Sequence, residues 1–471
     1  MHPDLLPGKH LLFDHHTVAD TFCLRHRIHQ PRRETDELVL KPEKPWEGRF
    51  PSPTDIKFDP KRGVYRMWYS VFRPDLDAER FTLKGAVLGR VGEPQSLYMC
   101  YAESRDGIHW DRPDLGIYPD PAGPNNICHK GFSRGGVANV IHRPDAPPDE
   151  RYMGMGLDWF SLELGGMIVT YSPDGLRWRY PENKPVIFGH SDTVNSLVYN
   201  PERKVFMVYM RGWHAAAVNW PALNKAHPRR RVAYAESADL KTWSESQIIL
   251  TPDELDPNDF YALQVFRYAD YYLGQLWIHN EEGDDTIEIE LVYSRDGFNW
   301  SRLPERPRFI PHGETGRPDS HMVMPCHEPV VVGDDIWVYY TGVNCPHGDT
   351  SYGKYSPVRG KLRMDGFLSL DAGPQSGALV TRPFTLQNDA ITINAVTTGG
   401  ELIVEITEPW FRETHGKPVE GFAAKDFDVF KGDAIAHKLS WKGSSDLSAL
   451  KGRRLMLRIW MKHAQLYSFT I

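Results

Sequence analysis

Residues 293–300 read YSRDGFNW, a strand-like start that runs into an Asp-Gly pair and a tryptophan three residues later. Close copies are ESRDGIHW (103–110), YSPDGLRW (171–178) and ESADLKTW (236–243), and a degraded copy, RMDGFLSL (363–370), keeps Asp-Gly without the tryptophan. The shared aspartates lie at fairly even intervals, at Asp106, Asp174, Asp239, Asp296 and Asp365. Internal self-similarity of this kind indicates a repeated supersecondary unit.

A second repeat alternates with these octets and has the form of a strand, a polar turn and an aromatic strand. Its copies are TDIKFDPKRGVYRMWYS, NVIHRPDAPPDERYMGMGL, LVYNPERKVFMVYMRG, LQVFRYADYYLGQLWIHN and PVVVGDDIWVYYTG. Alternating apolar residues around Pro, Asp and Gly turns are typical of β-hairpins. Five hairpins, each followed by an octet, predict five four-stranded units, and radial packing protects the edges of such units. We therefore expect a five-bladed β-propeller.

The pattern changes after Ala372, where longer alternating runs such as GELIVEIT (400–407) and RRLMLRIWMKHAQLYSFTI (453–471) carry no octet. Such runs are typical of antiparallel sheets with one buried face. The sequence thus predicts an all-β protein with two domains. Residues 1–372 form the propeller, closed by a strand from the N-terminal segment, and residues 373–471 form a C-terminal antiparallel β-sandwich.

The octets themselves are interpreted as scaffold. In an Asp-Gly turn the aspartate accepts backbone N–H bonds, and the glycine adopts the positive φ that other residues resist. The tryptophan then buries a large apolar ring between neighbouring sheets. A residue that recurs in every copy serves the geometry that all copies share. We therefore assign Asp106, Asp174, Asp239 and Asp296 to turns rather than to catalysis.

These S-x-D-G-x-x-W turns resemble those on the outer strands of five-bladed propeller glycosidases and, in looser form, the Asp-boxes of sialidases. Five blades followed by a β-sandwich are similar to the layout of the glycoside hydrolase family 32 and 43 superfamily. The resemblance implies a glycosidase with carboxylates at one mouth of the central channel. The family 32 signatures WMNDPNG, RDP and EC are absent, so no catalytic residue is carried over from that family.

The candidate catalytic residues are acids that precede the first strand of a hairpin. Glycoside cleavage needs two carboxyl groups in different environments, one protonated and one ionised. Asp192 is the first candidate for the acid or base, with Asp259 and Asp319 as its partner and pKa tuner. Each of the three also fits a turn-capping role, which aspartate commonly plays.

Polar and aromatic residues expected near the same mouth are candidates for substrate binding. Sugars present apolar faces and rims of hydroxyls, so they suit stacking rings beside charged donors. The candidates are Trp46, Glu47, Asp55, Asn195, Arg211, Trp213, His279, His321, Glu328 and His347. Trp277 is a further stacking candidate, although tryptophans of a propeller also serve as inter-blade core.

Histidines and cysteines gather in HMVMPCHEP (321–329) and NCPHGD (344–349). Their spacing matches none of the usual zinc patterns, so we expect hydrogen-bonding histidines, no cofactor and no metal site. A structural or channel-bound cation stays open. The chain also lacks a Walker loop, a dinucleotide glycine fingerprint and a nucleophile elbow.

A formal net charge of −7 argues against a general nucleic-acid or acidic-membrane binder, because both need a basic field. We expect a carbohydrate substrate, with homo-oligomer formation left open. The five cysteines are odd in number and widely spaced, which favours unpaired thiols in a reducing compartment. The first residues show no cationic start followed by an apolar run, so the expected location is cytoplasmic, with a removed leader left open.

Three functional hypotheses remain at this stage. The first is an exo-acting glycoside hydrolase that takes a terminal sugar, since a pocket closed by loops suits a chain end. The second is a glycoside phosphorylase similar to the five-bladed mannoside phosphorylases, in which Arg211, His279 and His347 hold phosphate. The third is a propeller that binds carbohydrate without catalysis, because a fold alone does not determine a function.

Overall fold

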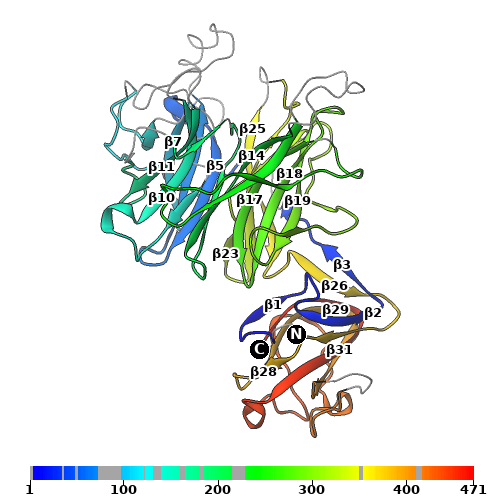
Figure 1. Ribbon diagram of the computed structural model, residues 1–471. Helices are drawn as coiled ribbons and strands as arrows, with labels where there is room; N and C mark the ends of the chain where they lie inside the picture. The colour runs from blue at the N-terminus through cyan, green and yellow to red at the C-terminus, as the bar shows by residue number, and fades with distance from the viewer. Residues whose placement is uncertain are drawn as a thin grey trace.

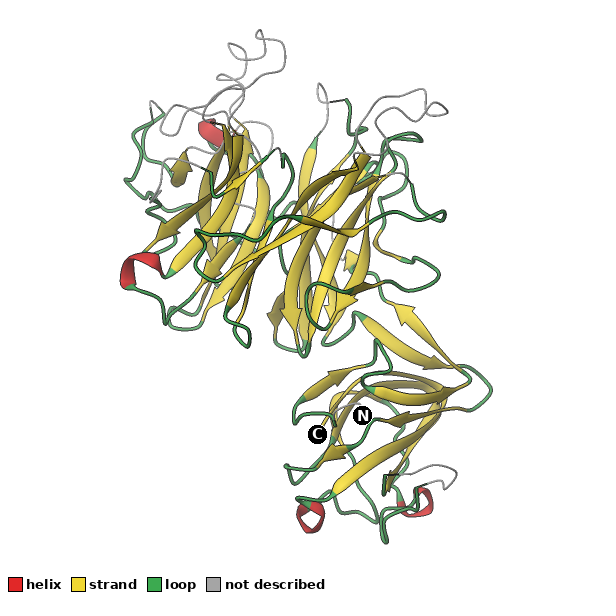
Figure 2. Ribbon diagram, in the orientation of Figure 1, coloured by secondary structure: helices red, strands yellow, loops and turns green. Residues whose placement is uncertain are grey.

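The computed structural model is an all-β protein (Figure 2). Strands and turns are interrupted by single-turn 3-10 helices at η1 (Pro45–Glu47), η2 (Pro148–Glu150), η4 (Ala424–Asp426) and η5 (Ser448–Leu450). Across the described chain, no helix has the length and apolar character needed to span a membrane. The structure describes residues 4–33, 37–47, 51–72, 97–120, 122–130, 139–159, 165–179, 185–189, 191–214, 229–257, 259–349, 354–409 and 416–471.

Three antiparallel sheets of four strands follow one another along the chain (Figure 1). The first contains β5 (Ser52–Asp59), β6 (Val64–Phe72), β7 (Leu97–Ser104) and β8 (Ile127–Lys130). The second contains β9 (Val140–His142), β10 (Tyr152–Trp159), β11 (Gly165–Ser172) and β12 (Ile187–Phe188). The third contains β13 (Ser196–Asn200), β14 (Val205–His214), β15 (Arg229–Ser237) and β16 (Gln247–Leu250).

A ten-stranded sheet follows and divides into two groups, joined by one parallel residue pair, Ile287 with Met322. The first group comprises β17 (Asp259–Tyr268), β18 (Tyr271–His279), β19 (Ile287–Ser294), β20 (Trp300–Ser301) and β21 (Arg308–Ile310). The second comprises β22 (Met322–Pro325), β23 (Val330–Val332), β24 (Asp335–Val343), β25 (Tyr355–Arg363) and β4 (Arg32–Arg33). Its last strand comes from the N-terminal segment, since β4 pairs antiparallel with β25.

The first and last of these strand groups pack against each other. A buried apolar cluster joins Tyr65 and Tyr69 of β6 to Tyr339 of β24 and Val330 of β23. Similar clusters join the first group to the second, the second to the third and the third to the group of β17–β19. Each group therefore has an apolar partner on both sides.

A separate nine-stranded sheet combines both ends of the chain (Figure 1). It contains β1 (Lys9–Leu11), β2 (Val18–Phe22), β3 (Leu24–Ile28), β26 (Leu368–Ala372), β27 (Gly377–Thr381), β28 (Phe384–Thr385), β29 (Thr392–Thr407), β30 (Asp433–Lys438) and β31 (Arg454–Thr470). The early strands β1, β2 and β3 pair with β31, β27 and β26, respectively. The predicted domain boundary at residue 372 stays a prediction. The pairing of β1, β2 and β3 adds residues 9–28 to the C-terminal sheet.

The octets form the expected turns. Oδ1 of Asp296 accepts the backbone N–H groups of Phe298 and Asn299, both at 2.8 Å, and the hydroxyl of Ser294 at 3.1 Å. Gly297 has a φ of +78°. Asp106, Asp174 and Asp239 accept the same set of bonds in their own turns. The interpretation of these acids as turn residues is confirmed.

The octet turns also join neighbouring strand groups. Tyr339 of β24 donates its hydroxyl hydrogen bond to the Gly107 carbonyl at 2.6 Å, and Tyr209 of β14 donates to the Gly297 carbonyl at 2.7 Å. The octet tryptophans pack in the same direction, with Trp110 edge-on to Tyr339 and Trp300 edge-on to Tyr209. These two octets therefore fix their own turns and bind a neighbouring sheet at once.

Candidate functional site

Tyr261 is the centre of a group of charged and aromatic side chains at one end of β17. It is the extra residue of a β-bulge, because Phe260 and Ala262 pair with consecutive residues of β18. Bulges redirect a side chain and recur near functional sites. The ring of Tyr261 stacks on Trp277, with ring centroids 5.9 Å apart and planes at 15°.

Two guanidinium groups lie near this ring. That of Arg211, on β14, is 4.5 Å from the centroid of the Tyr261 ring, and that of Arg230, on β15, is 5.6 Å from it. Both distances lie within the range of cation–π attraction. The end of β17 thus combines an aromatic ring with two permanent cations from the neighbouring sheet.

Asp259 and Glu281 form a hydrogen-bonded carboxyl pair next to Arg230. Asp259 is fully buried, and Glu281 is 36% exposed. Burial raises the pKa of Asp259, and the hydrogen bond to Glu281 raises it further. Burial alone would raise the pKa of Glu281 too, but the hydrogen bond with Asp259 and the nearby Arg230 outweigh it and lower that pKa to about 2. The pKa values of the two carboxyl groups are therefore driven apart, with that of Asp259 the higher.

Asp192 lies on the other side of Arg211, with which it forms an ion pair. Nη2 of Arg211 also donates to the backbone carbonyl of Tyr261 at 3.3 Å. Asp192 is 20% exposed, whereas Arg211 is almost completely buried. Asp192 and Asp259, predicted from separate hairpins, are thus both paired with an arginine that lies at the Tyr261 ring.

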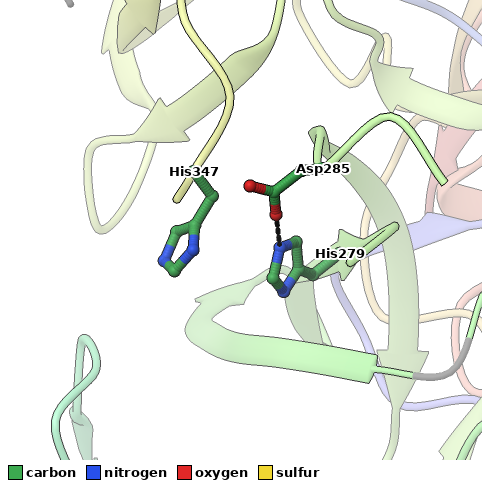
Figure 3. Close-up of side chains that lie close together, drawn as sticks. All are labelled: His279, Asp285 and His347. Carbon is green, nitrogen blue, oxygen red and sulfur yellow. Dashed lines mark hydrogen bonds and ion pairs between the residues drawn. The ribbon is translucent and has the colours of Figure 1, made fainter. Parts of the chain in front are cut away.

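His279 and His347, also predicted, meet at the same ring together with Asp285 (Figure 3). Nε2 of His279 lies 2.8 Å from Oδ1 of Asp285, and Nε2 of His347 lies 3.1 Å from the Tyr261 hydroxyl. Burial lowers the pKa of both imidazoles, that of His347 to about 4, and Arg230 lowers both further. Both rings are therefore neutral near pH 7.

Asp319 is held apart from this group. Its Oδ2 accepts Nη1 of Arg33 at 2.8 Å and the hydroxyl of Tyr340 at 3.2 Å. Among the described side chains, no hydrogen bond or ion pair connects Asp319 with Asp192 or Asp259. The predicted role of Asp319 as a partner acid stays a prediction.

Asp55 and Glu328 meet in a second cluster, around Lys57. Lys57 pairs with both carboxylates, and Oδ2 of Asp55 accepts the backbone N–H of Val140 at 2.7 Å. Burial raises the pKa of Asp55 to about 6; Lys57 opposes this shift and Glu328 adds to it. This cluster connects β5, β9 and the segment after β22, and no described contact joins it to Tyr261.

Glu47, Trp46 and Asn195 are buried among protein partners. The Glu47 carboxylate accepts bonds from Tyr69 and Arg112 and from two backbone N–H groups. The indole N–H of Trp46 donates to an asparagine side chain, and Asn195 bonds to its own turn. Their geometry gives no support to a substrate contact.

Trp213 and His321 are only partly buried. Trp213 lies with Arg211 on a pocket of about 380 Å³ between β11 and β14. His321 contacts the hydroxyl of Ser320 at 3.0 Å. A larger cavity of about 700 Å³ lies beside β3 and β26, and none of the predicted site residues lines it.

Sequence reasoning missed several members of the site. Glu281 and Asp285 lie in the segment HNEEGDDT (279–286), Arg230 is the second residue of β15, and Tyr261 lies two residues after Asp259. Loop charges have no periodicity that distinguishes a site from a solvated turn. A usable signal was their position, because Glu281 and Asp285 follow β18 just as His347 follows β24.

The comparisons with known proteins agree with the resemblance expected from the octets. An invertase from Schizosaccharomyces pombe is 24% identical over 154 residues, a match that spans 31% of this chain and 24% of the invertase. No family model matches the sequence.

The solved structures found by comparison are carbohydrate-active enzymes at low similarity. A fructofuranosidase from Schwanniomyces occidentalis complexed with fructose has a TM-score of 0.41 and 10% identity, covering 92% of this chain and 96% of its own. An endo-arabinase from Bacteroides thetaiotaomicron has a TM-score of 0.41 and 10% identity, and the match covers 72% of this chain and 98% of the endo-arabinase. A member of a family of mannoside phosphorylases that contains glycoside hydrolases has a TM-score of 0.43 and 13% identity, and the match covers 71% of this chain and 94% of that protein.

Proposed function

We propose that this protein is an exo-acting glycoside hydrolase that removes a terminal sugar by carboxylate acid–base catalysis around Tyr261. The observation that carries the proposal is the carboxyl pair of Asp259 and Glu281, whose pKa values are driven apart next to the ion-paired Asp192. Two acids with opposite protonation beside a third carboxylate supply the acid and the base that glycoside cleavage needs.

The roles follow from exposure. Asp259 is fully buried, so it holds the proton without touching the sugar. Glu281 reaches solvent and takes that proton through their hydrogen bond, to deliver it to the leaving oxygen. Asp192, ion-paired with Arg211, is the base or nucleophile. Asp259 is thus a positioning residue, and Glu281 and Asp192 are the catalytic pair.

We also propose that the five strand groups are the blades of one propeller. The proposal is supported by the apolar clusters that join consecutive groups and the first group to the last. The pocket of about 380 Å³ lined by Arg211 and Trp213 is in the size range of small-ligand sites, and it adjoins the catalytic group through Arg211, the partner of Asp192. Trp213 would stack on the sugar face.

The test is turnover of a panel of aryl glycosides by Asp192→Asn and Glu281→Gln, with Glu254→Gln as the control. Glu254 is an exposed acid outside the site. Loss of one acid or base typically costs about 10²–10⁴-fold in rate, so we expect kcat to fall by that factor in both site variants only. Full activity of both site variants, with unchanged circular dichroism, would overturn the assignment.

A phosphorylase is the second candidate, and the two guanidinium groups at Tyr261 favour it. Arg211 and Arg230 are permanent cations of the kind that bind phosphate oxygens. Dependence of turnover on added phosphate, with release of a sugar phosphate, would identify this reaction. Sugar binding without turnover, in the presence or absence of phosphate, would instead indicate a non-catalytic propeller.

A further inference from the structure

We propose that His279, Asp285 and His347 bind one divalent transition-metal ion, with zinc as the best match. One donor atom from each of the three residues lies within 4.8 Å of the other two. The three come from different loops and strands, and Figure 3 shows their side chains turned toward a common point. The proposal does not depend on glycoside cleavage, because it rests on the donor set alone.

The donor types suit zinc. Two imidazoles and one carboxylate form a set found in catalytic zinc sites, which keep a further position for water or substrate. Nε2 of His279 and Oδ1 of Asp285 lie 2.8 Å apart, so they need to separate by about 0.6 Å to reach the roughly 3.4 Å between two tetrahedral ligands with bonds of about 2.0–2.2 Å. The centroids of the two imidazole rings are 4.8 Å apart, so His347 needs only a small adjustment to complete the set.

The surroundings orient these ligands as a metal site requires. Metal-binding histidines usually bond through their second nitrogen to an oxygen, and Nε2 of His347 contacts the Tyr261 hydroxyl at 3.1 Å. This contact leaves Nδ1 of His347 as the ligand atom. Oδ2 of Asp285 accepts the backbone N–H of Gly348 at 2.6 Å, which leaves Oδ1 for the ion. The outer contacts therefore fix the donor atom on His347 and on Asp285.

The charge of the site also favours a cation. Asp192 and the pair of Asp259 and Glu281 are occupied by Arg211 and Arg230. Within the described part of the chain, the ion pairs of Asp285 involve only His279, and no Lys or Arg side chain is among them. Asp285 therefore differs from the neighbouring carboxylates in having no ion-paired Lys or Arg within the described chain.

Backbone hydrogen bonds hold Asp285 in place in the loop before β19. Asp285 has a φ of +56°, in the left-handed region that only a minority of residues other than glycine adopt. Its backbone N–H bonds to the Asn280 carbonyl, and its carbonyl accepts the N–H of His347. The turn thus fastens Asp285 to both histidine-bearing segments, and an ion there would lie beside Tyr261 with an open position toward the carboxylates.

The experiment measures metal binding directly on the full chain. Protein stripped with a chelator is titrated with Zn²⁺ against a chromophoric competitor, and Co²⁺ is added in parallel to record its ligand-field absorption. We expect one ion per chain, and about 100-fold or weaker binding in His279→Gln, Asp285→Asn and His347→Gln. His312→Gln is the matched control, because His312 lies 3.9 Å from Glu288 outside the site.

Equal Zn²⁺ affinity of the wild type and the three ligand variants would overturn the proposal, as would an equal loss in the control. A second measurement uses only the wild type, in case a variant does not fold. Diethyl pyrocarbonate modification, read by peptide mass spectrometry, should fall at His347 when Zn²⁺ is added and stay unchanged at His312. Unchanged modification of His347 would also contradict the site. Either result leaves the hydrolase proposal standing, since its test uses Asp192 and Glu281.

Discussion

Arg230 binds Asp259 twice, through its backbone N–H to Oδ1 at 2.7 Å and through Nη1 to Oδ2 at 2.9 Å. The same Nη1 lies 3.0 Å from Oε2 of Glu281. One guanidinium therefore serves both members of the carboxyl pair, and it lowers the pKa of each. Without this cation the pair would hold its proton to higher pH.

Replacing Arg230 should consequently shift the pH dependence of the reaction. In Arg230→Gln the basic limb of the kcat/KM profile should move up by about 1 pH unit or more, because an opposite charge at this range lowers a carboxyl pKa by that amount. Arg267→Gln is the control, since Arg267 pairs with Glu202 on the surface. A basic limb at the same pH in both variants would contradict the assignment of the pair as the proton donor.

Asp55 should make folding stability depend on pH. Its pKa is about 6 in the folded chain against an ordinary 3.8, so the folded state binds this proton more tightly. The stabilisation that this proton gives the folded state is fully present below about pH 4 and is lost as the pH rises through 6. A difference of about two units between the folded and unfolded pKa values corresponds to roughly 3 kcal/mol of unfolding free energy. Asp55→Asn should lack this loss. Urea unfolding of both proteins at pH 4 and pH 7 checks it, and a difference that does not change with pH would refute it.

The hydroxyl of Tyr339 should stabilise the contact between the first and last strand groups. Tyr339→Phe leaves the Gly107 carbonyl without this donor in a buried position, which should cost about 1–2 kcal/mol of unfolding free energy. Tyr467→Phe is the control, because Tyr467 bonds to Gln465 of the same strand. Denaturant unfolding compares the two, and an equal or smaller loss in Tyr339→Phe would argue against an inter-sheet role.

Asp365 should couple the two parts of the molecule. Its carboxylate accepts bonds from Lys9 at 2.7 Å, Tyr268 at 2.6 Å and Ser468 at 2.6 Å, so it ties β17 to both chain ends. Asp365→Ala should destabilise the protein by about 2–4 kcal/mol and split the calorimetric transition. Asp433→Ala removes an exposed partner of Arg363 nearby and should do neither. A single, unshifted transition in Asp365→Ala would contradict this coupling.

The turns were predictable from the sequence because their geometry is local. Ser294, Asp296 and Gly297 form their hydrogen bonds with one another within four residues, so the sequence of the octet alone accounts for the turn. The site was partly predictable by the same logic. Asp259 and His279 are register partners at one end of β17 and β18, and the position of the first strand predicted both.

The remainder of the site depends on distant pairing, which the sequence does not display. Glu47 resembled a channel acid, but Arg112 and Tyr69, far along the chain, occupy its carboxylate. The histidines and cysteines of the segment after residue 320 separate in the fold. His327 is buried against Ser196, whereas His347 joins His279 and Asp285. Proximity in sequence was therefore misleading for these residues.

The pairing of β4 with β25 also sets the order in which the chain can fold during synthesis. Arg32 meets Lys361 across about 330 residues, so the last strand group cannot be completed until most of the chain has left the ribosome. The entropy cost of closing so long a loop grows only slowly with its length. Until then β4 lacks its partner, and unpaired strand edges favour aggregation. Slow translation before residue 363 would prolong that exposure, and shortening the N-terminal segment would leave the edge of β25 permanently unpaired.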